Sequence, residues 1–254
     1  MQPFAIALDL LRFSGLANVF RGRCAGVGAL LTLHHVRPPR DTRQFAPNRI
    51  LDISPEYLEA AIRELDTLGY EFVSLDEFHA RMIERRFDRR FVSFTLDDGY
   101  LDNYTYAYPI FRRHAVPFAI YLCTGIMDRT AQLWWQELEA IVAKAHELRV
   151  ALDGDARVFA TRTVKEKYRA FGTIYWRLRA MPHEAQLDSM QQLRDEYAPQ
   201  LESADVEPLT WEMVAEMRAS GLFTIGGHTV NHFALSKLSA DSLYDEIERG
   251  CAVV

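Results

Sequence analysis

Residues 93–99 have the sequence Ser93-Phe94-Thr95-Leu96-Asp97-Asp98-Gly99, and the rest of the chain is interpreted from this segment. It is an apolar, β-branched run that ends in two adjacent carboxylates and a glycine, which is typical of a buried strand followed by a tight turn. Neighbouring side chains of a strand point to opposite faces, so Asp97 and Asp98 can converge on one site only where the backbone bends, as Gly99 would permit. The stretch therefore predicts a strand that delivers two acids to a loop at its carboxyl end.

Predicted strands and helices alternate on both sides of this stretch. Short apolar runs predict strands at 28–33, 70–73, 91–96, 118–123 and 222–225. Helical spacing predicts helices at 55–68, 75–86, 100–114, 211–219 and 239–250. Ser54 and Thr210 are expected N-caps, Ser74 with Glu77 is expected to form a capping box, and Pro109 should break the third helix. Such alternation is typical of parallel βαβ units, whose functional residues lie where the strands end.

The composition is that of one globular domain spanning residues 1–254, with 49% apolar and 25% charged residues. Between about 128 and 208 the alternation lapses. Helices are expected at 133–145 and 165–181 and a hairpin at 153–155, so this segment is predicted to be a helical insertion over one end of the sheet. Five parallel strands are too few for the usual eight-stranded barrel, so either the sheet is open or the chain stops early.

Charge and hydropathy exclude several classes of protein. A net charge of -6 does not favour binding to nucleic acid or to an anionic membrane surface. No apolar stretch is long enough to span a membrane. The first eleven residues lack a basic segment, which favours an amphipathic helix over a signal peptide and leaves peripheral membrane contact open. Cys24, Cys123 and Cys251 have no metal-binding spacing, and their odd number indicates buried thiols in a reducing compartment. A cytoplasmic protein is therefore expected.

A second polar cluster is Gly226-Gly227-His228-Thr229-Val230-Asn231-His232. On a helical turn, histidines four residues apart lie on one face, as a shared metal requires. Asp98 would add one oxygen to their two nitrogens, a set that suits zinc or another borderline divalent ion and leaves positions for water and substrate. Asp97 would then be free to take a proton from metal-activated water.

Each of these features has a simpler structural explanation when it stands alone. Asp and Gly suit turns for local reasons, two histidines at this spacing are common on a solvated helix face, and His34-His35 beside two prolines could be loop residues. However, His34, the acid pair and His228 each follow directly on a predicted strand. Their combination at three strand ends favours a functional site.

The same residues resemble a known family. Thr95-Leu96-Asp97-Asp98-Gly99 resembles the T-F-D-D-G motif, and residues 228–232 resemble the H-[ST]-x-x-H motif, of polysaccharide deacetylases of the NodB-homology type, carbohydrate esterase family 4, which includes chitooligosaccharide deacetylases. Residues 97–109 resemble the continuation D-D-G-Y-x-D-N-Y-x-x-A-x-P of the first motif, and Trp134-Trp135 resembles a W-W-x-E-L stretch of some members. The resemblance covers about residues 28–254.

The resemblance implies a deformed (β/α) TIM-like barrel with fewer than eight strands. Asp98, His228 and His232 would bind a divalent metal, for which zinc is expected, and Asp97 would be the general base. The general acid of circularly permuted members lies in an early Y-H-x-[VI] segment. Leu33-His34-His35-Val36 resembles that segment, which indicates His34, with His35 as the alternative.

The chain also departs from the family pattern. Leu96 and Phe233 replace the usual Phe and Pro, and a later R-P-[YF]-G-like motif is absent, which suggests a product truncated at its C-terminus. Unpaired strand edges would then favour low stability or a homo-oligomer. The expected activity is removal of N-acetyl groups from N-acetylglucosamine-containing oligo- or polysaccharide. The alternatives are a catalytically impaired carbohydrate-binding or assembly protein and an amidohydrolase of a non-sugar amide.

Overall fold

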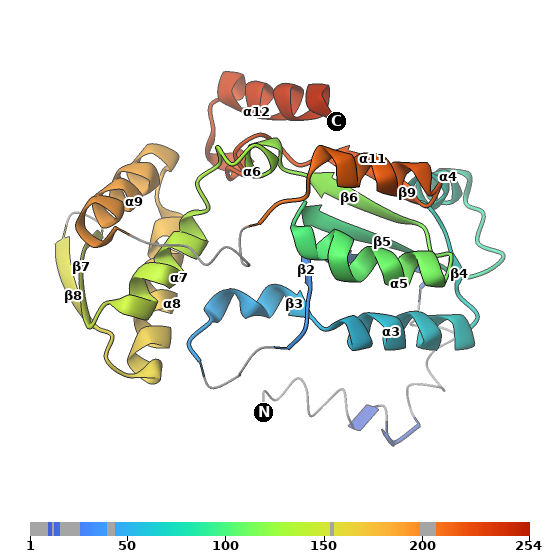
Figure 1. Ribbon diagram of the computed structural model, residues 1–254, viewed down its shortest axis with the longest axis horizontal. Coiled ribbons are helices and arrows are strands. Elements are labelled where there is room, and N and C mark those ends of the chain that lie inside the picture. The colour runs from blue at the N-terminus through green and yellow to red at the C-terminus, as the bar shows by residue number, and fades with distance from the viewer. Residues whose placement is uncertain (1–9, 12, 16–25, 40–43, 153–154, 199–206) are drawn as a thin grey trace.

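A five-stranded parallel sheet lies at the centre of the protein (Figure 1). The computed structural model describes residues 10–11, 13–15, 26–39, 44–152, 155–198 and 207–254. The strands are β1 (Gly28–Leu33), β4 (Glu71–Phe72), β5 (Phe91–Asp98), β6 (Phe118–Leu122) and β9 (Phe223–Gly227). Their order is β1-β5-β6-β9, and β4 pairs with the first two residues of β5. All five predicted strands and the parallel α/β class are confirmed, and in the described part of the chain the sheet is open.

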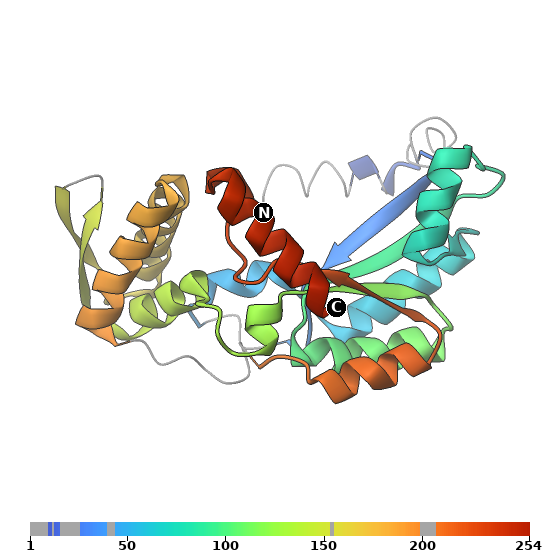
Figure 2. The ribbon, with the colours of Figure 1, turned by 90° about the horizontal axis from the view of Figure 1, so that it is seen from above.

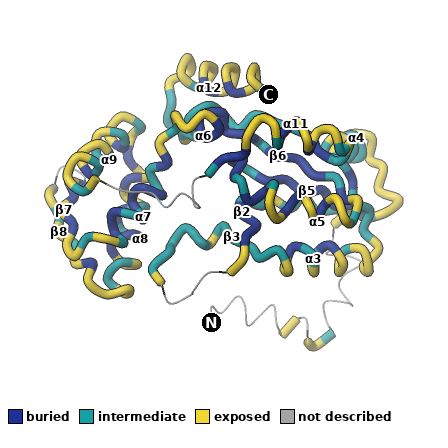
Figure 3. Tube along the Cα trace, viewed as in Figure 1, coloured by how far each residue is buried: buried dark blue, intermediate teal, exposed yellow. Residues whose placement is uncertain are grey.

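The central strand β5 is buried on both sides, which explains its continuous apolar sequence. Helices α3 (Pro55–Thr67), α5 (Tyr108–Arg113) and α11 (Trp211–Ala219) lie along one face of the sheet (Figures 1 and 2). Aromatic rings join the sheet to this layer. Phe111 of α5 stacks on Phe118 of β6 with 4.7 Å between ring centroids. The Phe94 ring lies 5.4 Å from that of Phe111, and the Phe223 ring lies 5.4 Å from that of Phe118. Figure 3 shows this buried centre in dark blue.

The register of the strands brings their carboxyl ends to one edge of the sheet. Asp98 of β5 pairs with Leu122 of β6, and Leu122 pairs with Gly227 of β9. On the other side of β5, Leu33 pairs with Leu96. Any polar residue that follows β1, β5 or β9 therefore lies at the same edge.

Capping residues account for most of the helix starts. Ser54 and Thr210 each accept a backbone N–H three residues ahead, as predicted for α3 and α11. Ser74 caps α4 (Leu75–Glu84) in the same way, but the predicted capping box is wrong in its second half. The Glu77 carboxylate instead forms ion pairs with Arg81 and Arg86.

The predicted break at Pro109 takes the form of a widened helical turn. The π-helix η2 (Asn103–Ala107) runs directly into α5, and the N–H of Tyr108 donates to the carbonyl oxygen of Asn103, five residues back. Proline lacks an N–H and its ring crowds the carbonyl four residues earlier, so a wider turn just before it relieves both conflicts. The helix therefore continues, and its first residues lie next to the loop that follows β1.

Residues 134–197 build a second layer of helices off the carboxyl end of the sheet (Figure 1). Its elements are α7 (Trp134–Lys144), β7 (Glu147–Leu152), β8 (Asp155–Ala160), α8 (Val164–Ala180) and α9 (His183–Tyr197). They share their own buried apolar core, separate from that of the sheet. The expected hairpin is present as the antiparallel pair β7 and β8, although its turn residues 153 and 154 lie outside the described part of the chain. A capping box does occur here, between Thr163 and Glu166.

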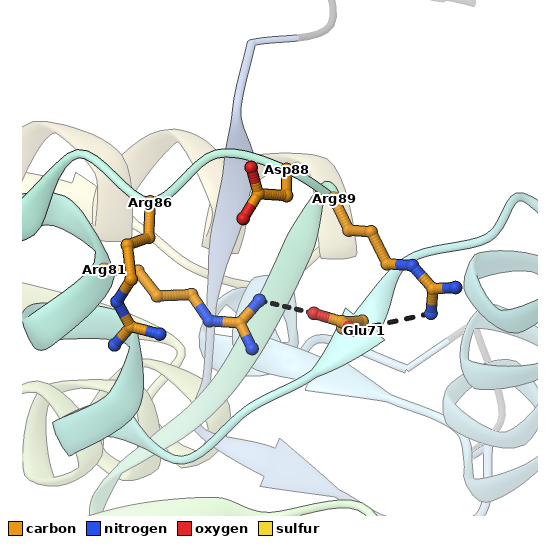
Figure 4. Close-up of a pocket in the computed structure, with 5 residues that line it drawn as sticks. All are labelled: Glu71, Arg81, Arg86, Asp88 and Arg89. Carbon is orange, nitrogen blue, oxygen red and sulfur yellow. Dashed lines mark hydrogen bonds and ion pairs between the residues drawn. The ribbon is translucent and has the colours of Figure 1, made fainter.

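Three further features complete the fold. Of the helix expected in the first eleven residues, only residues 10 and 11 are among the described residues. Cys24 lies outside them. None of the described helices combines the length and the apolar composition needed to cross a membrane. A cavity of about 280 Å³ lies at the amino end of β4 and β5, lined by Glu71, Arg81, Arg86, Asp88 and Arg89 (Figure 4). Glu71 there pairs with Arg81 and Arg89, so this cavity is an ion-pair cluster at the edge opposite to the strand ends considered below.

Candidate metal centre

Two consecutive left-handed residues end β5 and separate its two carboxylates. The strand continues through Asp97 and Asp98, two residues beyond the predicted end, and the backbone bends at Asp98 itself, with a φ of 74°, and at Gly99, with a φ of 85°. A Cβ on Gly99 would meet the Leu122 side chain at 2.7 Å, so a glycine is required there for space as well as for conformation. The Asp98 carboxyl becomes buried, whereas that of Asp97 stays 19% exposed.

The two histidines after β9 lie in an irregular turn, and their predicted helical geometry is wrong. In this segment, residues 228–232, called the histidine turn below, Thr229 and His232 have left-handed φ values of 67° and 58°. The imidazole rings of His228 and His232 still meet, with 5.0 Å between centroids. Hydrogen bonds from neighbouring elements, rather than helical spacing, bring them together. The N–H of Gly125, for example, donates to the carbonyl oxygen of Val230 at 2.8 Å.

Asp98, His228 and His232 form a donor set of the kind that binds a metal. One ligand atom from each residue lies within 4.8 Å of the other two. The Oδ1 atom of Asp98 is 3.1 Å from Nε2 of His232 and 3.6 Å from Nε2 of His228, yet it is buried without a hydrogen-bond partner. A buried carboxylate oxygen without a donor is costly unless a cation occupies the space in front of it. These residues therefore fit a divalent metal with two nitrogen ligands and one oxygen ligand.

Burial and neighbouring charges shift the pKa values of Asp97, Asp98 and His228. Burial raises the pKa of Asp98, but His232, His34 and His228 together outweigh it and hold that pKa below its ordinary value. Burial lowers the pKa of His228, and repulsion from His232 adds to this effect. For Asp97, burial raises the pKa above its ordinary value, against the opposing effect of His228 and His34. The lowered pKa thus favours the ionised form of Asp98, and Asp97 is the carboxylate that accepts a proton more readily.

His34 and His35 follow β1 but face different surroundings. Nε2 of His34 lies 3.9 Å from Oδ2 of Asp97, and its ring is 27% exposed. His35 is buried, its Nδ1 lies 2.6 Å from Oδ2 of Asp102, and its ring stacks on Tyr100 at 3.9 Å. Of the two histidines, His34 is therefore the one that lies beside the acid pair.

Part of the sequence matches a family model. Residues 84–150, which include Asp97 and Asp98, match the model described as polysaccharide deacetylase. This segment is therefore similar to polysaccharide deacetylases. The resemblance drawn from the sequence motifs is thereby confirmed, while His34, His228 and His232 lie outside the matched segment. No curated protein matches this chain.

Solved structures have a fold similar to that of this chain. The deacetylase PplD of Streptococcus pyogenes, in complex with acetate, has a TM-score of 0.50 and 16% identity, over 87% of this chain and 64% of that one. IcaB from Ammonifex degensii has a TM-score of 0.50 and 17% identity, over 89% of this chain and 66% of that one. This chain thus spans slightly less than two thirds of the length of each. At such identities the likeness concerns the fold.

Four residues around the candidate site have contacts that the sequence analysis did not assign. Asp102 and Asn103 hold the segment after β1: an Asp102 oxygen accepts the N–H of Val36, and Asn103 donates to the carbonyl oxygen of His34 at 2.8 Å. Asp102 and Asn103 belong to the D-D-G-Y-x-D-N-Y continuation of the first motif, and that position was the sequence feature that could have indicated their importance. Trp135 of α7 lies 4.9 Å from the His232 ring. Glu246 of the helix α12 (Ala240–Val253) accepts a hydrogen bond from the Asn231 N–H of the histidine turn. No local sequence pattern predicts that contact.

Proposed function

We propose that this chain is a metal-dependent hydrolase that removes N-acetyl groups from N-acetylglucosamine units of an oligo- or polysaccharide. The observation that carries the proposal is the convergence of Asp98, His228 and His232 around a buried carboxylate oxygen without a hydrogen-bond partner, with Asp97 beside it. The family match of residues 84–150 supports deacetylation of a sugar substrate in general. The donor set of two imidazoles and one carboxylate favours zinc as the metal.

Each residue has a defined part in the proposed reaction. Asp98, His228 and His232 would hold the metal, which when bound polarises the amide carbonyl and acidifies a water molecule. Asp97 takes the proton from the attacking water as the new carbon–oxygen bond forms. His34, 3.9 Å from the Asp97 carboxylate, protonates the amide nitrogen as the carbon–nitrogen bond breaks. The products are acetate and a free amine on the sugar.

The aromatic residue next to the histidine turn is a candidate sugar contact. Trp135 is half-buried, and its ring lies 4.9 Å from that of His232. An indole face beside the reacting group suits the apolar face of a pyranose ring. Replacing Trp135 by Ala should raise KM more than it lowers kcat. Trp176→Ala is the matched control, because Trp176 lies on α8, is 66% exposed and contacts Tyr175 and Arg179 of the same helix.

Acetate release tests the function. The wild-type chain, loaded with zinc, is incubated with N-acetylglucosamine oligomers, and acetate and free amine are measured in parallel. Asp97→Asn and His34→Ala should each lower kcat by at least about 100-fold, the usual contribution of one acid or base. His146→Ala, on an exposed histidine distant in the chain, should not.

The alternatives give different results in the same assay. Metal binding without acetate release from any acetylated sugar would refute the enzyme and favour a carbohydrate-binding or assembly protein. Release from small amides alone would indicate an amidohydrolase of a non-sugar substrate.

A further inference from the structure

The last helix of the chain, α12, lies directly on the histidine turn, although it supplies none of the three candidate metal ligands (Figure 1). We infer that Glu246 of α12 is a positioning residue for the metal site: its carboxylate fixes the turn that carries His228 and His232. The inference rests on the proposed metal site, and it assigns to α12 a role in metal affinity.

Glu246 receives three hydrogen bonds from the middle of the histidine turn. Its Oε2 atom accepts the backbone N–H of Val230 at 3.1 Å and that of Asn231 at 2.8 Å. Its Oε1 atom accepts the side-chain amide of Asn231 at 2.5 Å. The Glu246 residue is only 5% exposed. A buried carboxylate is costly unless donors surround it, and here the turn itself provides them.

The histidine turn needs such support because its backbone is strained. Thr229 and His232 both have left-handed φ values, and Thr229 is β-branched, for which this conformation is a clear outlier. Strained residues of this kind persist only where the surroundings hold them. Within the turn, the Thr229 hydroxyl oxygen accepts the N–H of His232 at 3.0 Å. Glu246 satisfies the two N–H groups between these residues.

Close packing fixes α12 over the turn. A Cβ on Gly250 would lie 2.9–3.0 Å from backbone atoms of Thr229, and one on Gly227 would lie 2.9 Å from Sγ of Cys251. The Gly250 contact leaves no room for a side chain, so α12 and the histidine turn approach each other backbone to backbone, and the Gly227 contact brings α12 equally close to the end of β9. Glu246 lies one helical turn before Gly250, on the same face of α12. Its carboxylate therefore reaches the turn from a fixed position.

The opposite side of the turn is held independently. The N–H groups of Thr124 and Gly125, at the start of α6 (Thr124–Met127), donate to the carbonyl oxygens of Thr229 and Val230 at 3.2 and 2.8 Å. The turn is thus held by its carbonyl groups from α6 and by its N–H groups from Glu246. If the α6 contacts sufficed, Glu246 would contribute to stability alone and not to the geometry of the ligands.

The experiment compares Glu246→Ala and Glu246→Gln with the wild type and with Glu248→Ala, an exposed glutamate on the same helix. In the metal-free protein, backbone hydrogen exchange at Val230 and Asn231 should accelerate in Glu246→Ala. Titration with Co²⁺ should show affinity lowered about 10–100-fold and an altered visible spectrum, the usual effect of removing a group that orients a ligand. Glu246→Gln keeps an acceptor oxygen and should recover part of both properties, whereas Glu248→Ala should match the wild type.

Two results would overturn the inference. One is Glu246→Ala that binds Co²⁺ with wild-type affinity and spectrum, even if its melting temperature is lower. The other is unchanged exchange at Val230 and Asn231 in the metal-free variant. Failure of the proposed function looks different: the wild type would release no acetate, while the exchange and Co²⁺ differences between Glu246→Ala and wild type persisted.

Discussion

Removing the Asp102 carboxylate should destabilise the protein and disturb the segment that carries His34. Asp102 is 9% exposed, and its oxygens meet Nδ1 of His35 at 2.6 Å, the N–H of Val36 at 3.2 Å and the amide of Asn103 at 3.0 Å. In Asp102→Ala the buried groups of His35 and Val36 lose their partner. An unsatisfied buried group costs about 1–3 kcal/mol, so the free energy of unfolding should fall by about 3 kcal/mol.

Asp102→Asn should have a smaller effect. The amide oxygen still accepts the Val36 N–H, and the His35 ring can present Nδ1 as an acceptor to the amide group, so a loss of about 1 kcal/mol is expected. The exposed Asp66 of α3 provides the control, and Asp66→Ala should change stability by less than about 0.5 kcal/mol.

Thermal and urea unfolding measure these differences. For a domain of this size 1 kcal/mol corresponds to about 2–4 °C, so Asp102→Ala should melt roughly 6–12 °C below the wild type. Acetate release should fall as well, because the Asp102 contacts place the residues around His34. The reasoning is refuted if Asp102→Ala unfolds at the same urea concentration as Asp66→Ala.

Three further outcomes follow from the same structure. Gly125→Ala should abolish metal binding, since its Cβ would lie 2.4 Å from a carbonyl oxygen of the histidine turn. Gly172→Ala, which has open space around it in α8, should instead raise the free energy of unfolding by about 0.5–1 kcal/mol. Metal titration and melting curves of both variants check these outcomes. Burial raises the pKa of Cys123 to about 12, so iodoacetamide at pH 8 should label the exposed Cys251 and spare Cys123 until the protein unfolds, as read by peptide mass spectrometry. Zinc at 100 times its dissociation constant should add about 2.7 kcal/mol to the free energy of unfolding, and Asp98→Asn should lose most of that gain; equal gains in the two proteins would contradict the assigned ligand.

Local patterns were sufficient to predict much of the fold. The five strands could be predicted because buried parallel strands are short and continuously apolar. The caps at Ser54 and Thr210 could be predicted because an N-cap acts within its own helical turn. Where a side chain had a choice of partners, the prediction failed: Glu77 binds Arg81 and Arg86 rather than closing a capping box. The roles assigned to His34, Asp97, Asp98, His228 and His232, and the single-domain reading, stay predictions.

The candidate site combines both kinds of information. The residues at the ends of β1, β5 and β9 could be read from the amino-acid sequence, because strand ends and turn residues are local properties. How these residues meet depends on the folded chain. The tertiary structure bends the chain at Asp98, holds the histidine turn in a strained form that helical spacing would not predict, and buries Glu246 against it from α12. Such contacts join residues far apart in the chain, and their energy exists only after the sheet, α6 and α12 have packed together.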